Sequence, residues 1–295
     1  MRTIPSGAGA VLAALMTVAL PAAGQTPPTA PANSLELQQV KPNLYLLTGG
    51  GGNSLAFITD LGVVLVDTKL SSQGPAIAQR LKSVTTKPVT TIINTHAHLD
   101  HVGGNEAFGG AVQIVAHENA RASMERMPAF AGAKVIALPK STFKERSTIG
   151  AGKDRIDLYY FGAGHTGGDV FVVFPSLSVV YCGDMFPERA LPLIDVKSGG
   201  SGIAYPVTLA AAVARIKTAN IVVTGHDGLL AWKDFEDYAR FMRFFRDYVV
   251  TGFNRGLSIG EVAAGWKSPE AYRDYTSPTD RVRADVEVIF GDLTK

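Results

Sequence analysis

The sequence predicts an α/β fold in which two β-sheets are covered by helices on their outer sides. Short apolar runs of strand length recur in both halves, at residues 44–47, 55–58 and 63–66 and again at 170–174. Segments with a helical spacing of apolar residues alternate with these runs, and the chain is 46% hydrophobic and 18% charged, as an ordinary globular protein is. Such alternation in both halves is typical of sheets with helices packed outside them.

The N-terminal residues are expected to precede the fold. Arg2 is followed by an apolar segment at residues 8–22 and by small residues at 22–24, the layout of a secretory signal peptide. A membrane anchor is the alternative, but the apolar segment is shorter than the ~20 residues that a spanning helix needs. The predicted organisation is a signal peptide at 1–24, a flexible Pro-rich leader at 25–34 and a domain at 35–295 with a C-terminal helical extension.

Charge and cysteine content restrict the function classes. The chain has 28 basic and 26 acidic side chains, a net charge of +2, and removing the signal segment with Arg2 would leave +1. This near neutrality gives no electrostatic argument for nucleic acid binding. Cys182 is the only cysteine, so an internal disulfide cannot form, and it lies far from the predicted cleavage site. We therefore expect a soluble periplasmic or secreted protein without a membrane anchor after cleavage.

The first half reads as a meander followed by alternating helices and strands. The runs at 44–47, 55–58 and 63–66 are separated by turn residues at 49–53 and 60–62, which favours antiparallel pairing. The expected elements that follow are a helix at 72–84, a strand at 89–93, a short helix at 105–108, a strand at 112–116 and a helix at 118–127.

The pattern changes near Gly162, and a second series of strands and helices follows. Aromatic residues recur every three or four positions within 232–250, which indicates a core-facing helix rather than a ligand site. The expected elements are strands at 170–174, 179–182 and 221–224 and helices at 206–217, 232–250 and 280–293.

The chemistry concentrates directly after the predicted strand at 89–93. Three of the six histidines and one carboxylate occupy six consecutive positions, as His96, His98, Asp100 and His101. In an extended segment His96 and His98 point to the same side and can bind one cation. Asp100 and His101 follow on a turning chain and can reach a second position. Because a catalytic zinc usually takes three protein ligands, further donors are expected from elsewhere.

Three further candidates lie at strand ends or in a Gly-rich loop. His165 lies in the Gly-rich loop, whereas Asp184 and His226 each follow a predicted strand through one glycine. Functional side chains often occupy such loops on an α/β scaffold. His117 precedes a polar helix and Cys182 ends an apolar run, so we interpret both as structural.

In this order and spacing, the residues resemble the signature of the metallo-β-lactamase-fold hydrolase superfamily. The resemblance covers about residues 35–230 and implies a four-layer αββα sandwich. Asp67 matches the acidic position that braces the histidine loop, so its implied role is to support the ligands. The implied ligands are His96, His98 and His165 for the first metal, Asp100, His101 and His226 for the second, and Asp184 as the bridge.

The resemblance implies a hydrolase with two zinc ions, with iron or manganese left open as the native metal. Two cations ~3.5–4 Å apart lower the pKa of a shared water to about 7, so that hydroxide forms and attacks the substrate. Asp100 is the catalytic candidate, placed to orient the nucleophile or to carry its proton. The expected substrates are small molecules with an ester, thioester, lactone or amide bond, β-lactams included.

Several features restrict the branches of the superfamily that this chain resembles. Only 41 residues separate Asp184 from His226, which leaves no room for the inserted domain of the nucleic-acid-processing branch. Asp184 separates the chain from β-lactamases with a cysteine ligand, and Pro187 stands where a lysine would be expected. Other β-lactamases lack both the cysteine and the bridging aspartate. The intact aspartate instead resembles thioester hydrolases, lactonases and related esterases.

Two other functions remain as alternatives, and two segments are candidates for contact with the substrate. An iron-dependent oxidoreductase of the persulfide dioxygenase type uses a related two-His, one-Asp site, and a non-catalytic metal-binding domain is the third reading. Residues 49–53 are a turn or a hairpin over the substrate. Substrate selection is expected within 185–205, from Phe186, Leu191, Leu193, Ile194 and Tyr205 with Arg189 and Lys197 as charged groups.

Overall fold

Two stacked β-sheets form the centre of the fold. The computed structural model describes Met1 and residues 35–295, so the predicted signal peptide and leader lie, apart from Met1, outside the described residues. The first sheet has seven strands in chain order and the second has six. Their bounds are β1 Glu36–Lys41, β2 Leu44–Thr48, β3 Ser54–Ile58, β4 Val63–Val66, β5 Val89–Ile93, β6 Gln113–His117 and β7 Ser141–Phe143, then β8 Arg146–Ile149, β9 Ile156–Tyr159, β10 Phe171–Phe174, β11 Val179–Tyr181, β12 Ile221–Val223 and β13 Leu229–Ala231.

The first sheet begins as an antiparallel meander and continues with parallel strands. Strands β1 to β4 pair antiparallel, which confirms the predicted meander, and β4 to β7 pair parallel. In the second sheet β8 to β11 pair antiparallel, β12 joins β11 in parallel, and β13 closes the edge antiparallel. The parallel strands β4, β5 and β6 direct their carboxyl ends to one edge, as do β11 and β12 in the second sheet.

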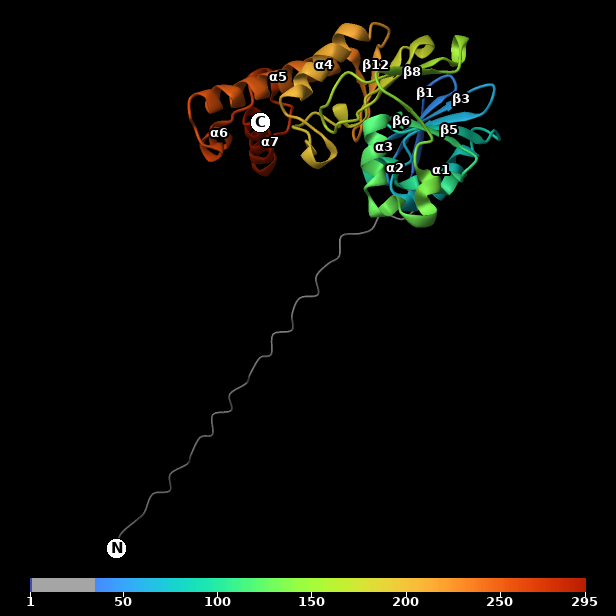
Figure 1. The fold of residues 1–295 in the computed structure, drawn as a ribbon, viewed down its shortest axis with the longest axis horizontal. Coiled ribbons are helices and arrows are strands. Elements are labelled where there is room, and N and C mark those ends of the chain that lie inside the picture. Colours follow the sequence, from blue (N-terminus) through green and yellow to red (C-terminus); the bar gives the residue numbers. More distant parts are fainter. Residues whose placement is uncertain (2–34) are drawn as a thin grey trace. The chain divides into compact units, whose positions relative to one another are not determined.

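Alternation along the strands places helices on the outer faces of both sheets. Leu46 faces the core between the sheets, whereas Leu47 belongs to the core beneath α1. Val172 likewise faces inward and Val173 outward toward α4 and α5. This arrangement is the predicted four-layer αββα sandwich, and Figure 1 shows α1 and α3 by the first sheet and α4 and α5 by the second. The helices span α1 Gly74–Leu81, α2 Leu99–Val102, α3 Glu118–Glu125, α4 Ala204–Arg215, α5 Trp232–Asn254, α6 Ile259–Gly265 and α7 Thr279–Leu293.

The differences from the predicted elements are local. The segment predicted as a helix at 72–84 is α1 preceded by a 3-10 turn, and the predicted helix at 105–108 is part of the 3-10 segment Gly103–Phe108. Strands β7, β8 and β13 were not predicted because they are only three or four residues long and largely exposed. Strand β9 was also missed, although three of its four residues are buried. Strand β1 was not predicted because its residues are mostly polar, as suits an edge strand.

Of the C-terminal helices, α5 packs on the outer face of the second sheet, and α6 and α7 pack against α5 and against each other. The predicted helices at 232–250 and 280–293 are α5 and α7, and the aromatic side chains Phe235, Phe241 and Phe245 of α5 are fully buried in the core, as expected. Helix α6 was not predicted, although Ser258 and Glu261 form a capping box at its start. Across residues 35–295, the helices are all too short or too polar to cross a bilayer.

Candidate metal centre

The fold brings all seven predicted metal-binding residues to one edge of the two sheets. They come from five places along the chain, each next to the end of a strand or on the turn that follows it. His96 and His98 lie on the loop after β5, Asp100 and His101 on the single turn α2, His165 between β9 and β10, Asp184 directly after β11, and His226 between β12 and β13.

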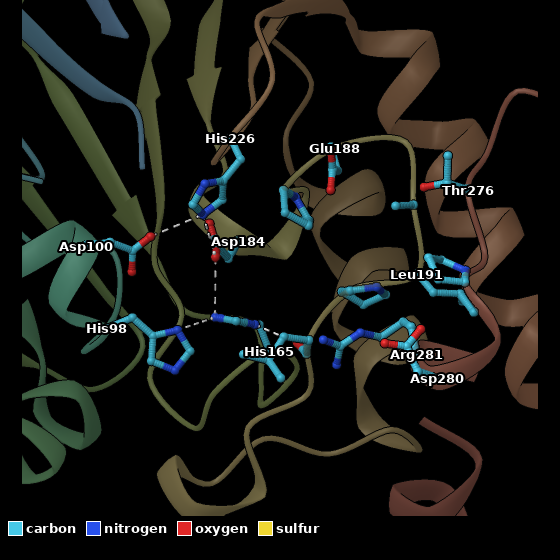
Figure 2. A pocket seen from close by; sticks show the side chains of 15 residues that line it. His98, Asp100, His165, Asp184, Glu188, Leu191, His226, Thr276, Asp280 and Arg281 are labelled. Atoms are coloured by element: carbon cyan, nitrogen blue, oxygen red, sulfur yellow. Dashed lines mark hydrogen bonds and ion pairs between the residues drawn. The ribbon is translucent and has the colours of Figure 1, made fainter. Parts of the chain in front are cut away.

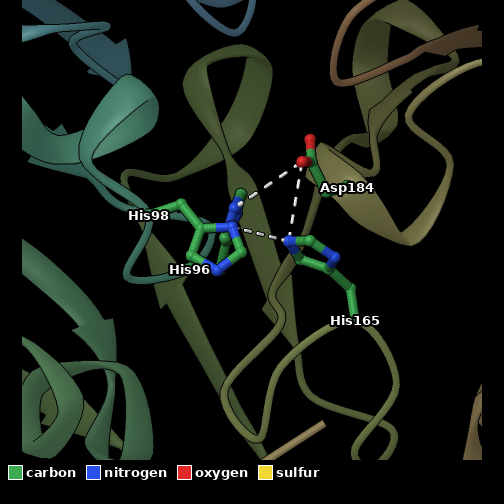
Figure 3. A group of neighbouring side chains, drawn as sticks. All are labelled: His96, His98, His165 and Asp184. Carbon is green, nitrogen blue, oxygen red and sulfur yellow. Dashed lines mark hydrogen bonds and ion pairs between the residues drawn. The ribbon is translucent and has the colours of Figure 1, made fainter. Parts of the chain in front are cut away.

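The first group consists of His96, His98, His165 and Asp184, whose candidate donor atoms all lie within 4.8 Å of one another. Figure 3 shows the three rings and the carboxylate converging on one point. Nε2 of His165 lies 2.9 Å from Nδ1 of His98 and 3.5 Å from Oδ2 of Asp184. Nε2 of His96 lies 3.9 Å from the same carboxylate oxygen. The grouping is the one that the sequence predicted for the first metal.

The second group consists of Asp100, His101 and His226. Nε2 of His226 lies 3.5 Å from Oδ2 of Asp100 and 3.4 Å from Nε2 of His101. Asp184 also reaches this group, because its Oδ1 lies 3.2 Å from His101 Nε2 and its Oδ2 lies 3.2 Å from His226 Nε2. One carboxylate therefore touches both groups, as the predicted bridging role requires.

Outer hydrogen bonds orient the histidine rings. Nδ1 of His165 donates to the carbonyl oxygen of Leu193 at 2.7 Å, and Nε2 of His98 lies 3.0 Å from Oδ2 of Asp195. A ring nitrogen that donates outward leaves the other nitrogen with its lone pair directed inward. His165 thus presents Nε2 to the first group, whereas His98 presents Nδ1.

Asp67 connects the histidine loop to the second group. Its Oδ1 accepts a hydrogen bond from the backbone N–H of Thr95, and its Oδ2 accepts from the Thr95 hydroxyl and lies 2.8 Å from Nδ1 of His101. The hydroxyl of Tyr181 lies 3.1 Å from the same oxygen. The side chain is fully buried and its φ is 57°, a backbone conformation that Asp tolerates better than most residues. The predicted bracing role of Asp67 is confirmed by these contacts.

Burial sets the ionisation of the first group. Burial lowers the pKa of His96 well below its usual value and also lowers the pKa of His165, so both rings are neutral. Burial raises the pKa of Asp184, but the charge of the neighbouring His101 outweighs it and holds that pKa well below the usual range. Neutral imidazole and ionised carboxylate are the forms that bind a metal.

The glycine-rich loop after β2 packs directly against the second group. The N–H of Gly52 donates to the carbonyl of Asp100 at 3.1 Å, and the N–H of Asn53 donates to the carbonyl of Gly225 at 2.7 Å. The buried Lys69 donates to the carbonyl of Gly52 at 2.6 Å, and burial lowers the pKa of Lys69 to about 7. These bonds identify the predicted turn at 49–53 as a brace for the site.

His117 and Cys182 have the structural roles that the sequence predicts. His117 is buried at the start of α3, where its Nδ1 accepts from the N–H of Asn119 and its ring stacks on Tyr160 at 3.8 Å. Cys182 belongs to the core outside the second sheet, and burial raises the pKa of its thiol well above the usual value. Neither residue is in the two groups.

Two supporting residues were missed from the sequence. Asp195 orients His98, and Asp169 accepts hydrogen bonds from the N–H and hydroxyl of Thr166 and so fixes the loop that carries His165. Asp169 could have been found from its place in the Gly-rich loop, three residues after Thr166. Nothing in the sequence near Asp195 connects it with His98, which is 97 residues away.

The donor set fits metal ions. Nε2 of His96 and Oδ1 of Asp184 are buried without a hydrogen-bond partner, and both face the groups described above. A buried polar atom without a partner is costly unless something binds it. Imidazole together with carboxylate suits zinc, and also iron, copper or nickel. The residues present therefore fit two cations that share Asp184.

The metal centre opens into a pocket of about 390 Å³ (Figure 2). Leu191 and Leu193 contribute to its wall, as predicted, whereas Phe186, Ile194 and Tyr205 are wrong as wall residues because all three are buried in the core. Arg189 pairs with Asp234 of α5 at 2.8 Å instead of lining the pocket. The other lining residues come from the metal centre, from the loop at 187–192 and from the segment that leads into α7.

A sequence profile described as the metallo-beta-lactamase superfamily matches residues 47–226. The chain belongs to this superfamily. The matched region contains all seven residues of the two groups, and the fold class expected from the resemblance is confirmed. The superfamily consists mainly of hydrolases that act on small molecules.

Individual relatives share about three in ten residues with this chain over the aligned regions. The metallo-beta-lactamase type 2 of Elizabethkingia meningoseptica is 28% identical over 253 residues, which cover 76% of this chain and 88% of the relative. The 2,4-dinitroanisole O-demethylase subunit alpha of Nocardioides sp. is 31% identical over 163 residues, 51% of this chain and 46% of the relative. The chain thus matches less than half the length of that subunit.

A solved structure shares the fold over a larger part of the chain. The sec-alkylsulfatase Pisa1 from Pseudomonas sp. superposes with a TM-score of 0.69 at 18% identity, covering 88% of this chain and 50% of the sulfatase. At this identity the likeness establishes the fold alone.

Proposed function

We propose that the chain is a hydrolase that uses two zinc ions to cleave an ester, thioester, lactone or amide bond in a small molecule, β-lactams included. The observation that carries the proposal is the position of Asp184. Its two oxygens lie 3.2 Å from His101 and His226 and 3.5 Å from His165, so one carboxylate can serve both groups. A single structural metal site would not need seven donors.

Zinc bound at such a centre lowers the pKa of water and polarises the bond to be cleaved. The residues of this chain supply the remaining requirements. His98, His165 and His226 line the pocket and direct substrate to the metal-binding edge. Asp100 also lines the pocket, and its side chain is one-third exposed, so Oδ2 can accept a proton from the attacking water and release it to solvent.

The test is a substrate screen on protein whose metals have been counted. Zinc-loaded protein is assayed with nitrocefin, aryl esters, lactones and lactoylglutathione, and metal content is measured on the same sample. We expect about two ions per chain and turnover of at least one class. Fewer than one ion per chain after loading would refute the proposal.

The substitution Asp184→Asn tests whether one carboxylate serves both groups. The amide keeps the shape but loses the negative charge that both groups share, so turnover should be abolished with a modest loss of folding stability. Circular dichroism establishes folding and metal analysis gives the ions per chain. Turnover equal to that of the unaltered protein would argue against the shared role.

The comparisons do not favour an iron-dependent oxidoreductase, because the superfamily is mainly hydrolytic. Anaerobic purification with metal analysis and an oxygen-consumption assay tests the point: iron together with oxygen uptake would reinstate that alternative.

We also propose that the protein is exported, on the basis of the signal-like layout of residues 1–24. N-terminal sequencing of the mature protein from a periplasmic or secreted fraction should start near Gln25. Recovery of the full chain with Met1 from the cytoplasm would contradict export.

A further inference from the structure

The wall of the pocket away from Asp100 and His98 comes from the C-terminal part of the chain. Thr276, Pro278, Asp280 and Arg281 line it, where the chain enters α7. Figure 2 shows Arg281 and Leu191 across the pocket from His98 and Asp100. The superfamily profile ends at residue 226, so this wall lies outside the matched region.

The position of this wall is fixed relative to the metal centre. Residues Ala190 and Thr276 form a parallel β-bridge, in which the N–H of Leu191 donates to the carbonyl of Thr276 at 3.0 Å and the N–H of Thr276 donates to the carbonyl of Arg189 at 2.9 Å. The loop after Asp184 and the approach to α7 therefore form one backbone unit. Val282 of the same helix is buried in the core and holds its first turn in place.

Arg281 is the only lysine or arginine among the 15 residues that line the pocket. Its guanidinium makes no hydrogen bond to any residue within 35–295. The carboxylate within ion-pair reach is that of Asp285, at 3.9 Å, which is too long for a hydrogen bond. Burial raises the pKa of Asp285 well above its usual value, which disfavours the ionised form that would neutralise Arg281.

Two acidic side chains, Glu188 and Asp280, also line the pocket. Neither forms an ion pair with Arg281 within the described part of the chain, where Asp285 is its only carboxylate partner inside 4.0 Å. These acids repel an anion elsewhere on the wall, so Arg281 is the one basic side chain that can attract a negative group away from the candidate metal centre. Leu191, Pro192 and Leu193 also line the pocket and give it apolar surface.

We propose that Arg281 binds a carboxylate of the substrate, at the end remote from the bond that is cleaved. The planar fork of a guanidinium matches a carboxylate with two parallel hydrogen bonds. The substrate class is then a small monoanionic ester or amide with an apolar middle section. This assignment rests on the proposed hydrolase function and specifies which of its substrates the site prefers.

The test compares carboxylate substrates with neutral substrates of the same shape. Mono-4-nitrophenyl esters of adipic, pimelic and suberic acid are assayed beside their terminal carboxamides, which have the same scissile bond. We expect zinc-loaded protein to prefer the best carboxylate over its carboxamide by about 10- to 100-fold in kcat/KM, the range for a charged hydrogen bond.

Substitution of the arginine should remove this preference. Arg281→Gln is expected to lower kcat/KM for the carboxylate by about 10- to 100-fold, mainly through KM, and to change the carboxamide by less than about 3-fold. The kcat/KM of Arg281→Lys for the carboxylate substrate should lie between those of the unaltered protein and of Arg281→Gln, because lysine keeps the charge but loses the planar fork. Arg283→Gln is the matched control, since Arg283 is exposed on the same helix and pairs with Glu287 away from the pocket.

The outcomes separate the two proposals. Equal losses for carboxylate and carboxamide would assign Arg281 a structural role, such as support for Asp285, and overturn the inference. Hydrolysis of both series without preference in the unaltered protein would also overturn it, while leaving the hydrolase function intact. No hydrolysis of any ester, lactone, thioester or β-lactam would refute the function and this assignment with it. If Arg281→Gln fails to fold, the ratio for Arg281→Lys decides: an unchanged preference overturns the inference.

Discussion

Gly52 shows how closely single residues control the metal centre. A Cβ atom added at this position would lie 2.2 Å from Cε1 and Nε2 of His101, much nearer than any real contact. His101 cannot yield, because its Nδ1 is held by Asp67 and the ring is fully buried. The absence of a side chain at Gly52 is therefore a requirement of the second group.

Gly52→Ala is expected to displace His101 and to weaken the second metal site. We expect a loss of about 10- to 100-fold in metal affinity or activity, as for other disturbances of ligand orientation. Titration with zinc and a chromophoric chelator gives the affinity of each site. Gly291→Ala, on α7 with open space around it, is the control. Two unchanged affinities in Gly52→Ala would contradict the packing argument.

Asp195 has a comparable role in the first group. Its Oδ1 accepts from the N–H groups of Lys197 and Ser198, whereas its Oδ2 holds Nε2 of His98. Asp195→Asn keeps one oxygen for the turn but places an N–H group against the N–H of His98. We expect metal affinity to fall by about 10- to 100-fold with little change in stability.

Chelator competition measures the effect of Asp195→Asn, and Asp237→Asn serves as the control because that carboxylate pairs with Lys233 on α5. Unchanged affinity in the first variant would show that His98 does not depend on Asp195.

At the scale of elements, α7 attaches the pocket wall to α5 and to the chain before α4. Ile289 is 1% exposed, and its Cγ1 lies 2.5 Å from the position that a Cβ on Gly202 would take, so the helix packs tightly against the chain before α4. Because Arg281 and Ile289 share this helix, its packing and the pocket geometry are linked.

Ile289→Ala should lower the free energy of unfolding by about 2–4 kcal/mol, since truncation of a fully buried isoleucine leaves a cavity. Urea unfolding gives the value, with Arg283→Ala as an exposed control on the same helix. A loss no larger than that of the control would mean that α7 is not packed as described.

The longer apolar elements and the seven donors could be predicted from the sequence because their signals are local. Apolar runs fixed β2 to β5, and glycines after strands marked Asp184 and His226. Contacts between distant segments could not be predicted. Asp195 contacts His98, which is 97 residues away in the sequence. The segment that carries Arg281 is held at the pocket by the β-bridge between Thr276 and Ala190, which no periodicity in the sequence indicates.

The two charged wall residues expected from the sequence, Arg189 and Lys197, do not line the pocket. Arg189 lies in the predicted segment but is held by Asp234 of α5, so a charged group near the site in sequence is committed elsewhere. The positively charged side chain that does line the pocket is Arg281 of α7.

On the scale of the whole molecule, Asp285 connects pH with stability. It is 1% exposed and neither carboxylate oxygen has a hydrogen-bond partner. Burial raises its pKa well above the value of about 3.9 for an unfolded chain. The folded state therefore binds its proton more tightly, and the associated stability is fully present below pH ~3.9 and lost as pH rises through the raised pKa.

Asp285→Asn should remove this part of the pH dependence. We expect the free energy of unfolding of the variant to fall less between pH 5 and pH 8 than that of the unaltered protein, in urea titrations of chelator-treated samples. Asp274→Asn, whose carboxylate is 86% exposed, is the control. Parallel curves for Asp285→Asn and the unaltered protein would contradict a raised pKa.

The β-bridge between Ala190 and Thr276 has an evolutionary consequence. All seven candidate donors lie within residues 47–226, whereas the opposite pocket wall is encoded at 276–281. Substitutions in that short stretch can reshape the pocket while every donor keeps its neighbours. Relatives that share the donors can therefore differ in the compounds they accept. Comparing their residues equivalent to 276–281 would group them by substrate.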